Sequence, residues 1–342
     1  MTWSPEVSTV NQRTQIGIET TPGTPVAADK RLSCFDWTLG IDPTVSSYRA
    51  SGTKYDSLQE EDIEQASIAV AGWLDYNGIC YVLSGVYGII SPGAADSSAT
   101  AKSWGYVPPV SGSIQPQTYS IQQGDAHRAR KLAYGLFNSW GYKGSRKTPF
   151  TISAKGFGLP ITDDGTVTLT ASPTDVVLAP APSKQFDVYL DSSSAGLGTT
   201  LLTRVLSVDF AGDSLYSPFF AFNRSTVGFG GHVDTAPKTS IKLLMEADSA
   251  GMAPLSYLQS GTTYYLRVEA QGAQIASDGG TGSDPVYNLF RHDMAIKFGK
   301  PSEYKDDQGI YALEWDCNVV LDTSWSTGQS QLITVQNLLA SL

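Results

Sequence analysis

Alternating apolar and polar positions recur along the chain and predict many short β-strands. In the segment IYALEWDCNVVLD, residues 310–322, alternation puts Tyr311, Leu313, Trp315 and Cys317 on one face. The same reasoning predicts strands over 14–20, 31–40, 65–75, 185–191, 201–212 and 239–247, with loops or hairpin arms over 42–62 and 213–236. Two short apolar segments, 77–87 and 252–260, are the best helix candidates, and the second ends at Gly261.

These predicted elements follow one another in the same order in both halves of the chain. Four pairs of apolar residues are each separated by about half of the 342-residue length: Ile16 with Val188, Leu32 with Leu206, Ile68 with Ile241, and Leu83 with Leu258. Any two strand-rich segments share some alternation of apolar and polar residues, but four matched pairs in the same order favour an internal duplication. The sequence therefore predicts a first module over 1–158, a linker over 159–184 and a second module over 185–342.

The composition supports a chain of short strands. The 33 glycines and 18 prolines interrupt the sequence often, and 17 Tyr, 12 Phe and 7 Trp suit half-buried sheet faces and interfaces. No stretch of about 18 apolar residues occurs, so no membrane-spanning helix and no membrane insertion are expected.

Groups that could carry catalysis are sparse. Cys34, Cys80 and Cys317 are widely spaced and odd in number, which indicates free thiols in a reducing cytoplasm. The three histidines, His127, His232 and His292, have no second His or Cys at metal-ligand spacing. The sequence predicts no enzyme activity, no catalytic residue, no metal and no cofactor.

The net charge of −10 argues against a protein that grips nucleic acid through phosphate contacts. One acidic run stands out, and it consists of Glu60, Glu61, Asp62 and Glu64. Basic residues cluster once, at Arg128, Arg130, Lys131, Lys143, Arg146, Lys147 and Lys155. Either set could be a solvated face, and either could be a contact between subunits. The basic set could also face phosphate groups, and the acidic set could face an enclosed anion.

Three segments carry a resemblance to a known family. They are QIGIETTPGTPVAADKRL at 15–32, TISAKGFG at 151–158, and GIYALEWDCNVVLDTSWSTGQSQLITVQN at 309–337. In order and texture the chain resembles the major tail tube proteins of phages with long, non-contractile tails. In that family a strand ending in Gly-x-Glu-Thr precedes a Thr/Pro/Gly turn and a basic-leucine strand.

The resemblance implies a mainly β fold of tandem β-sandwich modules, each with a flanking short helix, that contribute strands to a ring-closed β-barrel. Such modules form six-fold rings, and stacked rings conduct DNA to the host. Two modules per chain would let three chains form a pseudo-six-fold ring. The implied partners are further copies of the chain, the tape-measure, tail terminator and distal tail proteins, and double-stranded DNA in transient passage. The implied location is the virion tail, with assembly in the host cytoplasm.

Within such a tube, the charged sets gain specific roles. Glu60, Glu61, Asp62 and Glu64 would either line the lumen and repel DNA, or contact the basic set, Arg128 to Lys155, of the next ring. A second hypothesis is a β-sandwich adhesin or carbohydrate-binding protein. Its sugar-stacking residues would be Trp73, Trp104, Trp140, Trp315 and Trp325, although strand cores and interfaces are the more common place for tryptophan.

Overall fold

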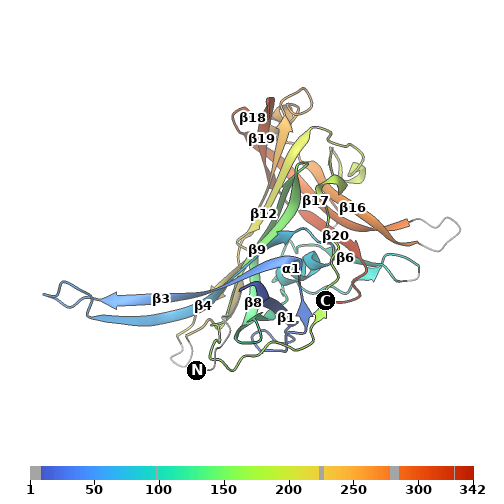
Figure 1. Cartoon of the computed structure of the whole chain (residues 1–342). Helices are drawn as coiled ribbons and strands as arrows, with labels where there is room; N and C mark the ends of the chain where they lie inside the picture. Colours follow the sequence, from blue (N-terminus) through green and yellow to red (C-terminus); the bar gives the residue numbers. More distant parts are fainter. Residues whose placement is uncertain (1–8, 98, 223–226, 278–284, 327) are drawn as a thin grey trace.

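The chain folds mainly as β-structure around a large sheet (Figure 1). The computed structural model describes residues 9–97, 99–222, 227–277, 285–326 and 328–342. Within these residues, 18 strands are connected by hydrogen bonds into one sheet, and β13 pairs separately with β14. The described α-helices are α1 (Gly78–Tyr87) and α2 (Pro254–Ser260), which confirms both helix predictions.

The strands agree closely with the alternating segments of the sequence. The first half contains β1 (Arg13–Ile18), β2 (Lys30–Arg31), β3 (Phe35–Tyr48), β4 (Leu58–Trp73), β5 (Gly93–Ala94), β6 (Lys102–Tyr106), β7 (Tyr119–Gly124), β8 (Ala129–Ser145) and β9 (Thr148–Gly158). The remainder contains β10 (Thr174–Asp175), β11 (Phe186–Asp191), β12 (Val205–Asp213), β13 (Tyr216–Phe219), β14 (Gly231–Asp234), β15 (Lys238–Glu246), β16 (Tyr264–Ser277), β17 (Pro285–Pro301), β18 (Lys305–Asp307), β19 (Ile310–Val319) and β20 (Gln331–Asn337).

The pairing of these strands follows one order in both halves. In the first half the neighbours run β1–β7–β8–β9–β4–β3. In the second half they run β11–β16–β17–β19–β15–β12, again antiparallel throughout. α1 follows β4, and α2 follows β15, so the helices occupy the same place in each order.

The registers refine the residue correspondence. Leu39 pairs with Ile68, and Phe210 pairs with Ile241, so the predicted match of Ile68 with Ile241 sets Leu39 level with Phe210. This places Leu206 level with Phe35, three residues beyond the Leu32 chosen from the sequence. Of the other predicted matches, Ile16 faces Ile121 in β7, and Val188 faces Val268 in β16.

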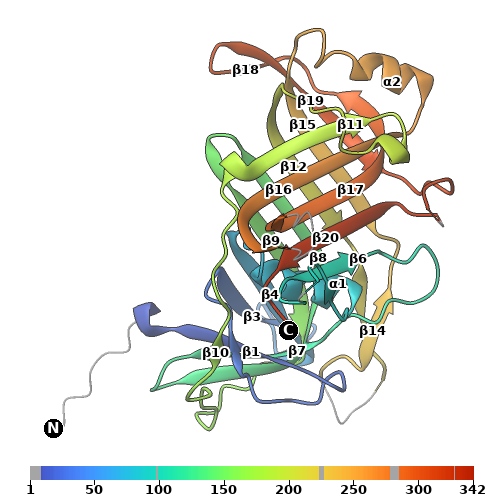
Figure 2. The ribbon, with the colours of Figure 1, turned by 90° about the vertical axis from the view of Figure 1, so that its right-hand side faces the viewer.

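One core runs through both halves. It includes the fully buried Phe137, Trp140, Phe210, Phe290 and Trp315. The strands β16, β17 and β20 run across β8 and β9 in Figure 2, and buried residues of β8, β9, β16, β17 and β20 belong to one core. Alternation in β19 buries Leu313, Trp315 and Cys317 as predicted.

The first helix lies inside this core. Gly78 to Val86 are all buried in α1, so the helix is apolar on every side. The Asp75 carboxylate accepts hydrogen bonds from the backbone N–H groups of Asn77 and Gly78, at 2.9 and 2.8 Å, and so satisfies donors at the helix start. The second helix is shorter and ends at Gly261, whose left-handed backbone stops it.

A long hairpin of β3 and β4 projects from the body of the molecule (Figure 1). From Asp42 to Tyr48 and from Leu58 to Asp62 every residue is exposed. The predicted arm at 42–62 is therefore a two-stranded arm, held by cross-strand hydrogen bonds. Its equivalent in the second half, the β13–β14 hairpin, is much shorter.

The sheet of a single chain stays open. Among the described strands, β3 pairs with β4 alone, and no pairing closes the sheet into a barrel. Cys34, Cys80 and Cys317 are free thiols, as the sequence predicted, and burial raises the pKa of Cys80 to about 12. None of the described helices combines the length and apolar character needed to cross a bilayer.

Candidate assembly surface

The two halves of the chain are joined by a strand pairing that we call the seam. It consists of Trp140–Ser145 of β8 paired antiparallel with Ser207–Gly212 of β12. Gly141 allows this approach, because a Cβ there would lie 2.4 Å from the Phe210 carbonyl oxygen. The seam makes one continuous sheet of β3–β4–β9–β8–β12–β15–β19.

Aromatic side chains from both halves fill the buried side of the seam. Tyr142 stacks on Phe210 with ring centroids 5.1 Å apart, and Phe150 stacks on Phe186 at 3.5 Å. Such stacking adds about 0.5–1.5 kcal/mol per pair beyond the apolar area that is buried. The seam is therefore a packed interface inside one chain.

His292 from β17 completes the seam. Its Nδ1 lies 3.1 Å from the Tyr142 hydroxyl, and its Nε2 lies 3.0 Å from the Gln331 amide oxygen. Because the amide oxygen can only accept, Nε2 carries the proton and Nδ1 accepts from Tyr142. Burial lowers the pKa of His292 to about 3, so the ring is neutral and structural.

The continuous sheet ends in two unpaired edges. At one end, β3 has no strand beyond it on the side away from β4 in the described residues. At the other end, β17 from Lys297 onward and β18 pair with β19 alone among the described strands. An unpaired edge offers its N–H and C=O groups to another chain.

The face of the continuous sheet opposite the core, called here the open face, carries mostly short side chains. In β4 it presents Ser67, Ala69 and Ala71, which are exposed and alternate with the buried Ala66, Ile68 and Val70. Runs such as SIAVAG already contained this signal, since small residues alternate there with large apolar ones. Sequence reasoning did not assign a role to this face.

Charges on the open face alternate across the strands. The register sets Lys143 beside Asp209, Asp209 beside Lys242, and Lys242 beside Asp316. The ammonium group of Lys242 lies 3.4 Å from the Asp316 carboxylate. Each of these lysines thus has a carboxylate on a neighbouring strand, which reduces its attraction for a third charge.

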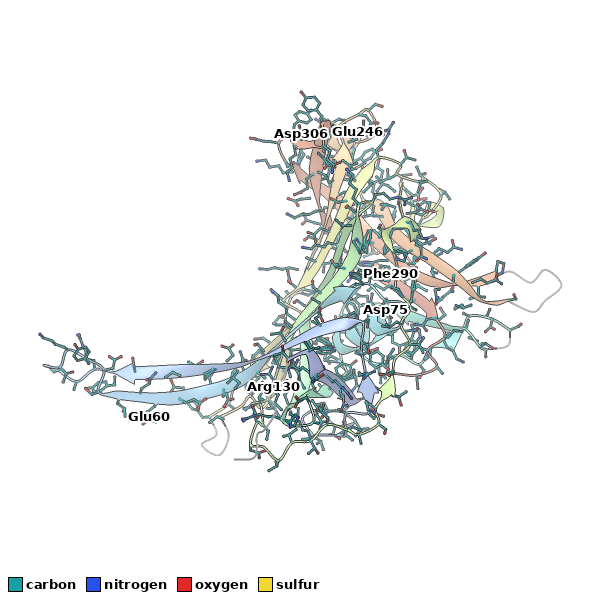
Figure 3. All side chains as sticks on the ribbon, viewed as in Figure 1. Glu60, Asp75, Arg130, Glu246, Phe290 and Asp306 are labelled. Atoms are coloured by element: carbon teal, nitrogen blue, oxygen red, sulfur yellow. The ribbon has the colours of Figure 1, made fainter. Side chains whose placement is uncertain are left out.

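The acidic set lies on the projecting arm, well away from the seam. Glu60, Glu61 and Asp62 are exposed in β4, and Figure 3 shows Glu60 toward the far end of the arm. Burial and the neighbouring Glu61 raise the pKa of Glu64, whose side chain is half-buried. The lumen and inter-ring roles both remain predictions for this set.

Six of the seven basic residues fall into two groups at opposite ends of β8. The seventh, Lys155, is exposed on β9 between Ala69 of β4 and Ser139 of β8. Arg128, Arg130 and Lys131 lie near its start, and Lys143, Arg146 and Lys147 lie near its end or in the turn beyond it. At about 3.3 Å per residue, the groups are roughly 40 Å apart. Arg128 pairs with Asp163 at 2.8 Å, and the Arg146 guanidinium donates to the Lys184 carbonyl at 3.4 Å. A single basic patch does not form.

The tryptophans proposed for sugar stacking are mostly in the core. Trp104, Trp140 and Trp315 are fully buried, and Trp325 is buried against Tyr265. Only Trp73 of the five is exposed, at 60%. These positions do not form a platform for a sugar.

The described residues contain no cluster of His, Cys, Asp and Glu that could hold a metal ion.

Sequence reasoning missed Tyr304 and Tyr311, which lie at the β17–β18 end of the sheet. A signal was available, because the dipeptide Tyr-Lys occurs at 142–143 and again at 304–305.

Comparison with protein-family models and with curated proteins finds no match to the chain.

Proposed function

We propose that the protein is a structural subunit of a phage tail tube, and that it polymerises as stacked rings into a conduit for DNA. The observation that carries the proposal is the shared pairing order of the two halves, joined by the seam and ending in two unpaired edges. Repetition of the seam between chains would join all edges and close the sheet around a lumen.

In this proposal the two halves are tandem tube modules, each a β-sandwich with one short helix. Three chains then supply six modules, which form a pseudo-six-fold ring. The contact is head to tail, because the two edges belong to different strands of the chain. Such a contact either closes into a ring or continues as a filament.

The open face suits the lining of a DNA conduit. Short side chains leave the bore smooth, and lysines such as Lys242 are already flanked by carboxylates. Duplex DNA carries about one negative charge per 1.7 Å, and a run of free lysines would hold it in place. Lys143 and Lys242 lie beside carboxylates and Lys155 does not, so the wall carries few free lysines and allows DNA to slide.

The projecting arm has a surface that suits contact between rings. It has little core of its own, and its exposed apolar residues include Val45, Tyr48 and Leu58. If the arm bound the next ring, this apolar surface would be removed from water. The tape-measure, terminator and distal tail proteins would then meet the tube along its bore and at its two ends, in the virion tail.

Electron microscopy of the purified protein tests the proposal. We expect rings and stacked tubes with a central channel, and a mass of three chains per ring by native mass spectrometry. A compact monomer at high concentration, with no ring in any salt condition, would contradict the tube proposal. Rings of six chains would contradict only the trimer.

A further inference from the structure

Two tyrosines are exposed side by side at the β17–β18 end of the sheet. Tyr304 is 62% exposed and Tyr311 is 76% exposed, and their ring centroids are 6.3 Å apart. Asp306, next to them in the chain, is labelled at the tip of this end in Figure 3. Large aromatic rings at an open sheet edge indicate an interaction surface.

The strand registers show which residues in the first half are equivalent to this pair. Thr151 of β9 pairs with Lys143 and with Trp73, and Ala312 of β19 pairs with Lys305 and with Glu246 in the same arrangement. It follows that Lys305 corresponds to Lys143, Tyr304 to Tyr142, and Tyr311 to Phe150.

The corresponding residues of the first half are buried, whereas Tyr304 and Tyr311 are exposed. Tyr142 is 1% exposed and Phe150 is 4% exposed. They are covered because Phe210 stacks on the first and Phe186 on the second, and both covering rings come from the following module. In the described residues, no ring from another strand covers Tyr304 and Tyr311 in this way.

The other end of the chain carries the matching edge. Leu39 pairs with Ile68 as Phe210 pairs with Ile241, so Asp36–Ile41 of β3 corresponds to Ser207–Gly212 of the seam. This edge of β3 has no strand partner in the described residues. The Trp37 carbonyl accepts a hydrogen bond from the Gln123 side chain at 2.8 Å, and a strand docking here would take over that acceptor.

We propose that Tyr304 and Tyr311 are the docking site for a second copy of this chain, whose Asp36–Ile41 edge pairs antiparallel with residues 302–307 in the register of the seam. The inference rests on the proposed function and extends it by naming the residues through which two chains would pair. Occupation by a second copy is indicated because the chain already contains one instance of this contact, between its own modules.

The seam fixes the residues that meet. Lys143 lies opposite Asp209, so Lys305 lies opposite Thr38 of the second copy. Tyr142 lies opposite Phe210, so Tyr304 lies opposite Leu39. The contact buries the two tyrosines and adds backbone hydrogen bonds to both free edges.

Cysteine cross-linking tests this register. Directly opposed residues in an antiparallel pair have Cα atoms about 4.5–5.5 Å apart, which a disulfide can bridge. The test variant is Thr38→Cys with Lys305→Cys, oxidised mildly after assembly. The internal control is Lys143→Cys with Asp209→Cys, which should form a disulfide within one chain. The distance control is Ala69→Cys with Lys305→Cys, because Ala69 lies one strand farther from the edge.

We expect the test variant to give dimers and trimers on a non-reducing gel, and the distance control to give monomer. Each single-cysteine variant, run on the same gel, shows whether the native thiol of Cys34 contributes to the cross-links. Rings or tubes in micrographs without the disulfide would overturn the register while the tube proposal stands. Absence of both rings and cross-links would overturn both proposals.

A second variant does not depend on disulfide geometry. Tyr304→Asp adds a charge to a side chain that is exposed in the single chain, so the fold should be retained. We expect unchanged thermal unfolding of the monomer and at least a tenfold rise in the concentration needed for ring formation. The matched control is Tyr55→Asp, which is exposed in the turn of the arm and lies outside Asp36–Ile41 and residues 302–307. Unimpaired ring formation by Tyr304→Asp would overturn the docking site.

Discussion

Tyr142 and Phe210 stack with an interplanar angle of 19°, although they belong to different halves of the chain. Tyr142 comes from β8 and Phe210 from β12, and the two strands are joined by backbone hydrogen bonds along the seam. The stability of the whole chain therefore depends on this contact between its two halves. Its energy can be measured inside one molecule.

Tyr142→Ala should lower the free energy of unfolding by about 3–5 kcal/mol. The change removes a large buried ring and leaves the His292 Nδ1 without its hydrogen-bond donor. Tyr304→Ala is the matched control, because it removes the equivalent but exposed ring and should change monomer stability by no more than about 0.5 kcal/mol. Urea denaturation of unassembled protein measures both. Equal losses for the two variants would contradict the assigned difference in burial.

Acid should destabilise the seam through His292. The folded pKa of about 3 lies below the ordinary value of 6.5, so the neutral ring contributes its full stability above pH 6.5. That stability is lost as the pH falls from 6.5 toward 3, because the unfolded chain binds a proton that the folded chain does not. The expected loss is about 2 kcal/mol between pH 6.5 and pH 5.

His292→Gln isolates this effect from the titration of carboxylates. Glutamine keeps a polar side chain at the seam but does not titrate, so its unfolding free energy should fall less between pH 6.5 and pH 5. Parallel denaturation series at the two pH values give the comparison. An identical pH slope in both proteins would show that His292 is not the responsible group.

Much of this fold could be predicted from the sequence, because alternation and turns are local signals. Both helices and most strands follow from such patterns. The seam could not be predicted, since its pairing joins β8 to β12 across more than sixty residues and no local pattern records which edge meets which. For the same reason, Arg130 and Arg146 looked clustered in sequence, but an extended strand separates them.

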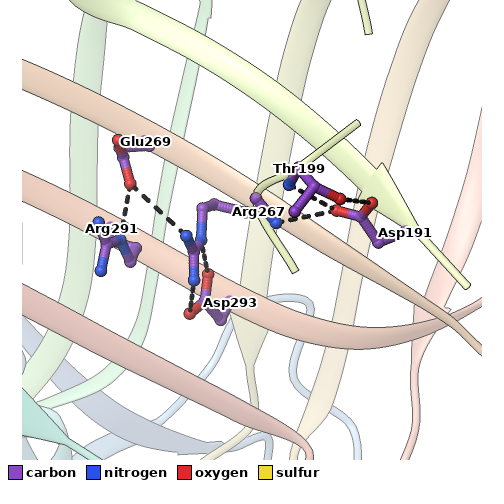
Figure 4. A network of polar contacts seen from close by, with 7 residues as sticks. Asp191, Thr199, Arg267, Glu269, Arg291 and Asp293 are labelled. Atoms are coloured by element: carbon purple, nitrogen blue, oxygen red, sulfur yellow. Dashed lines mark hydrogen bonds and ion pairs between the residues drawn. The ribbon is translucent and has the colours of Figure 1, made fainter. Parts of the chain in front are cut away.

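A partly buried ion-pair network holds the β16–β17 hairpin (Figure 4). The Arg267 guanidinium lies 2.7 Å from the Asp293 carboxylate, and Glu269 lies 2.6 Å from Arg291. Burial lowers the pKa of Arg267 less than the Asp293 and Glu269 carboxylates raise it, so the arginine stays charged. Removal of either Arg267 or Asp293 would therefore leave the other charge without its partner.

Arg267→Met should destabilise the chain by about 3–5 kcal/mol, because it leaves the Asp293 carboxylate buried without its partner. The double variant Arg267→Met with Asp293→Leu should recover much of that loss. Arg128→Met is the control, since its pair with Asp163 is exposed and should not affect stability measurably. Thermal unfolding of the three variants measures the effect. Failure of the double variant to recover stability would indicate a packing role for Arg267.

The arm offers a way to separate ring formation from ring stacking. Thr44 pairs with Ile63, so residues 45–62 can be replaced by Asn-Gly, a two-residue turn that suits a β-hairpin. Because most of the removed side chains are exposed, the unfolding free energy of the monomer should change little. We expect rings of normal mass and a loss of long tubes in negative-stain micrographs.

The acidic set distinguishes between two roles of the same arm. Replacing Glu60, Glu61, Asp62 and Glu64 by the matching amides removes charge at nearly constant shape. If the set contacts a basic surface of the next ring, the variant should form shorter tubes, and tube length should depend less on salt. If the set lines the lumen, tube length should not change. Normal tubes with unaltered salt dependence would exclude the inter-ring role, and the charge would then act on the DNA alone.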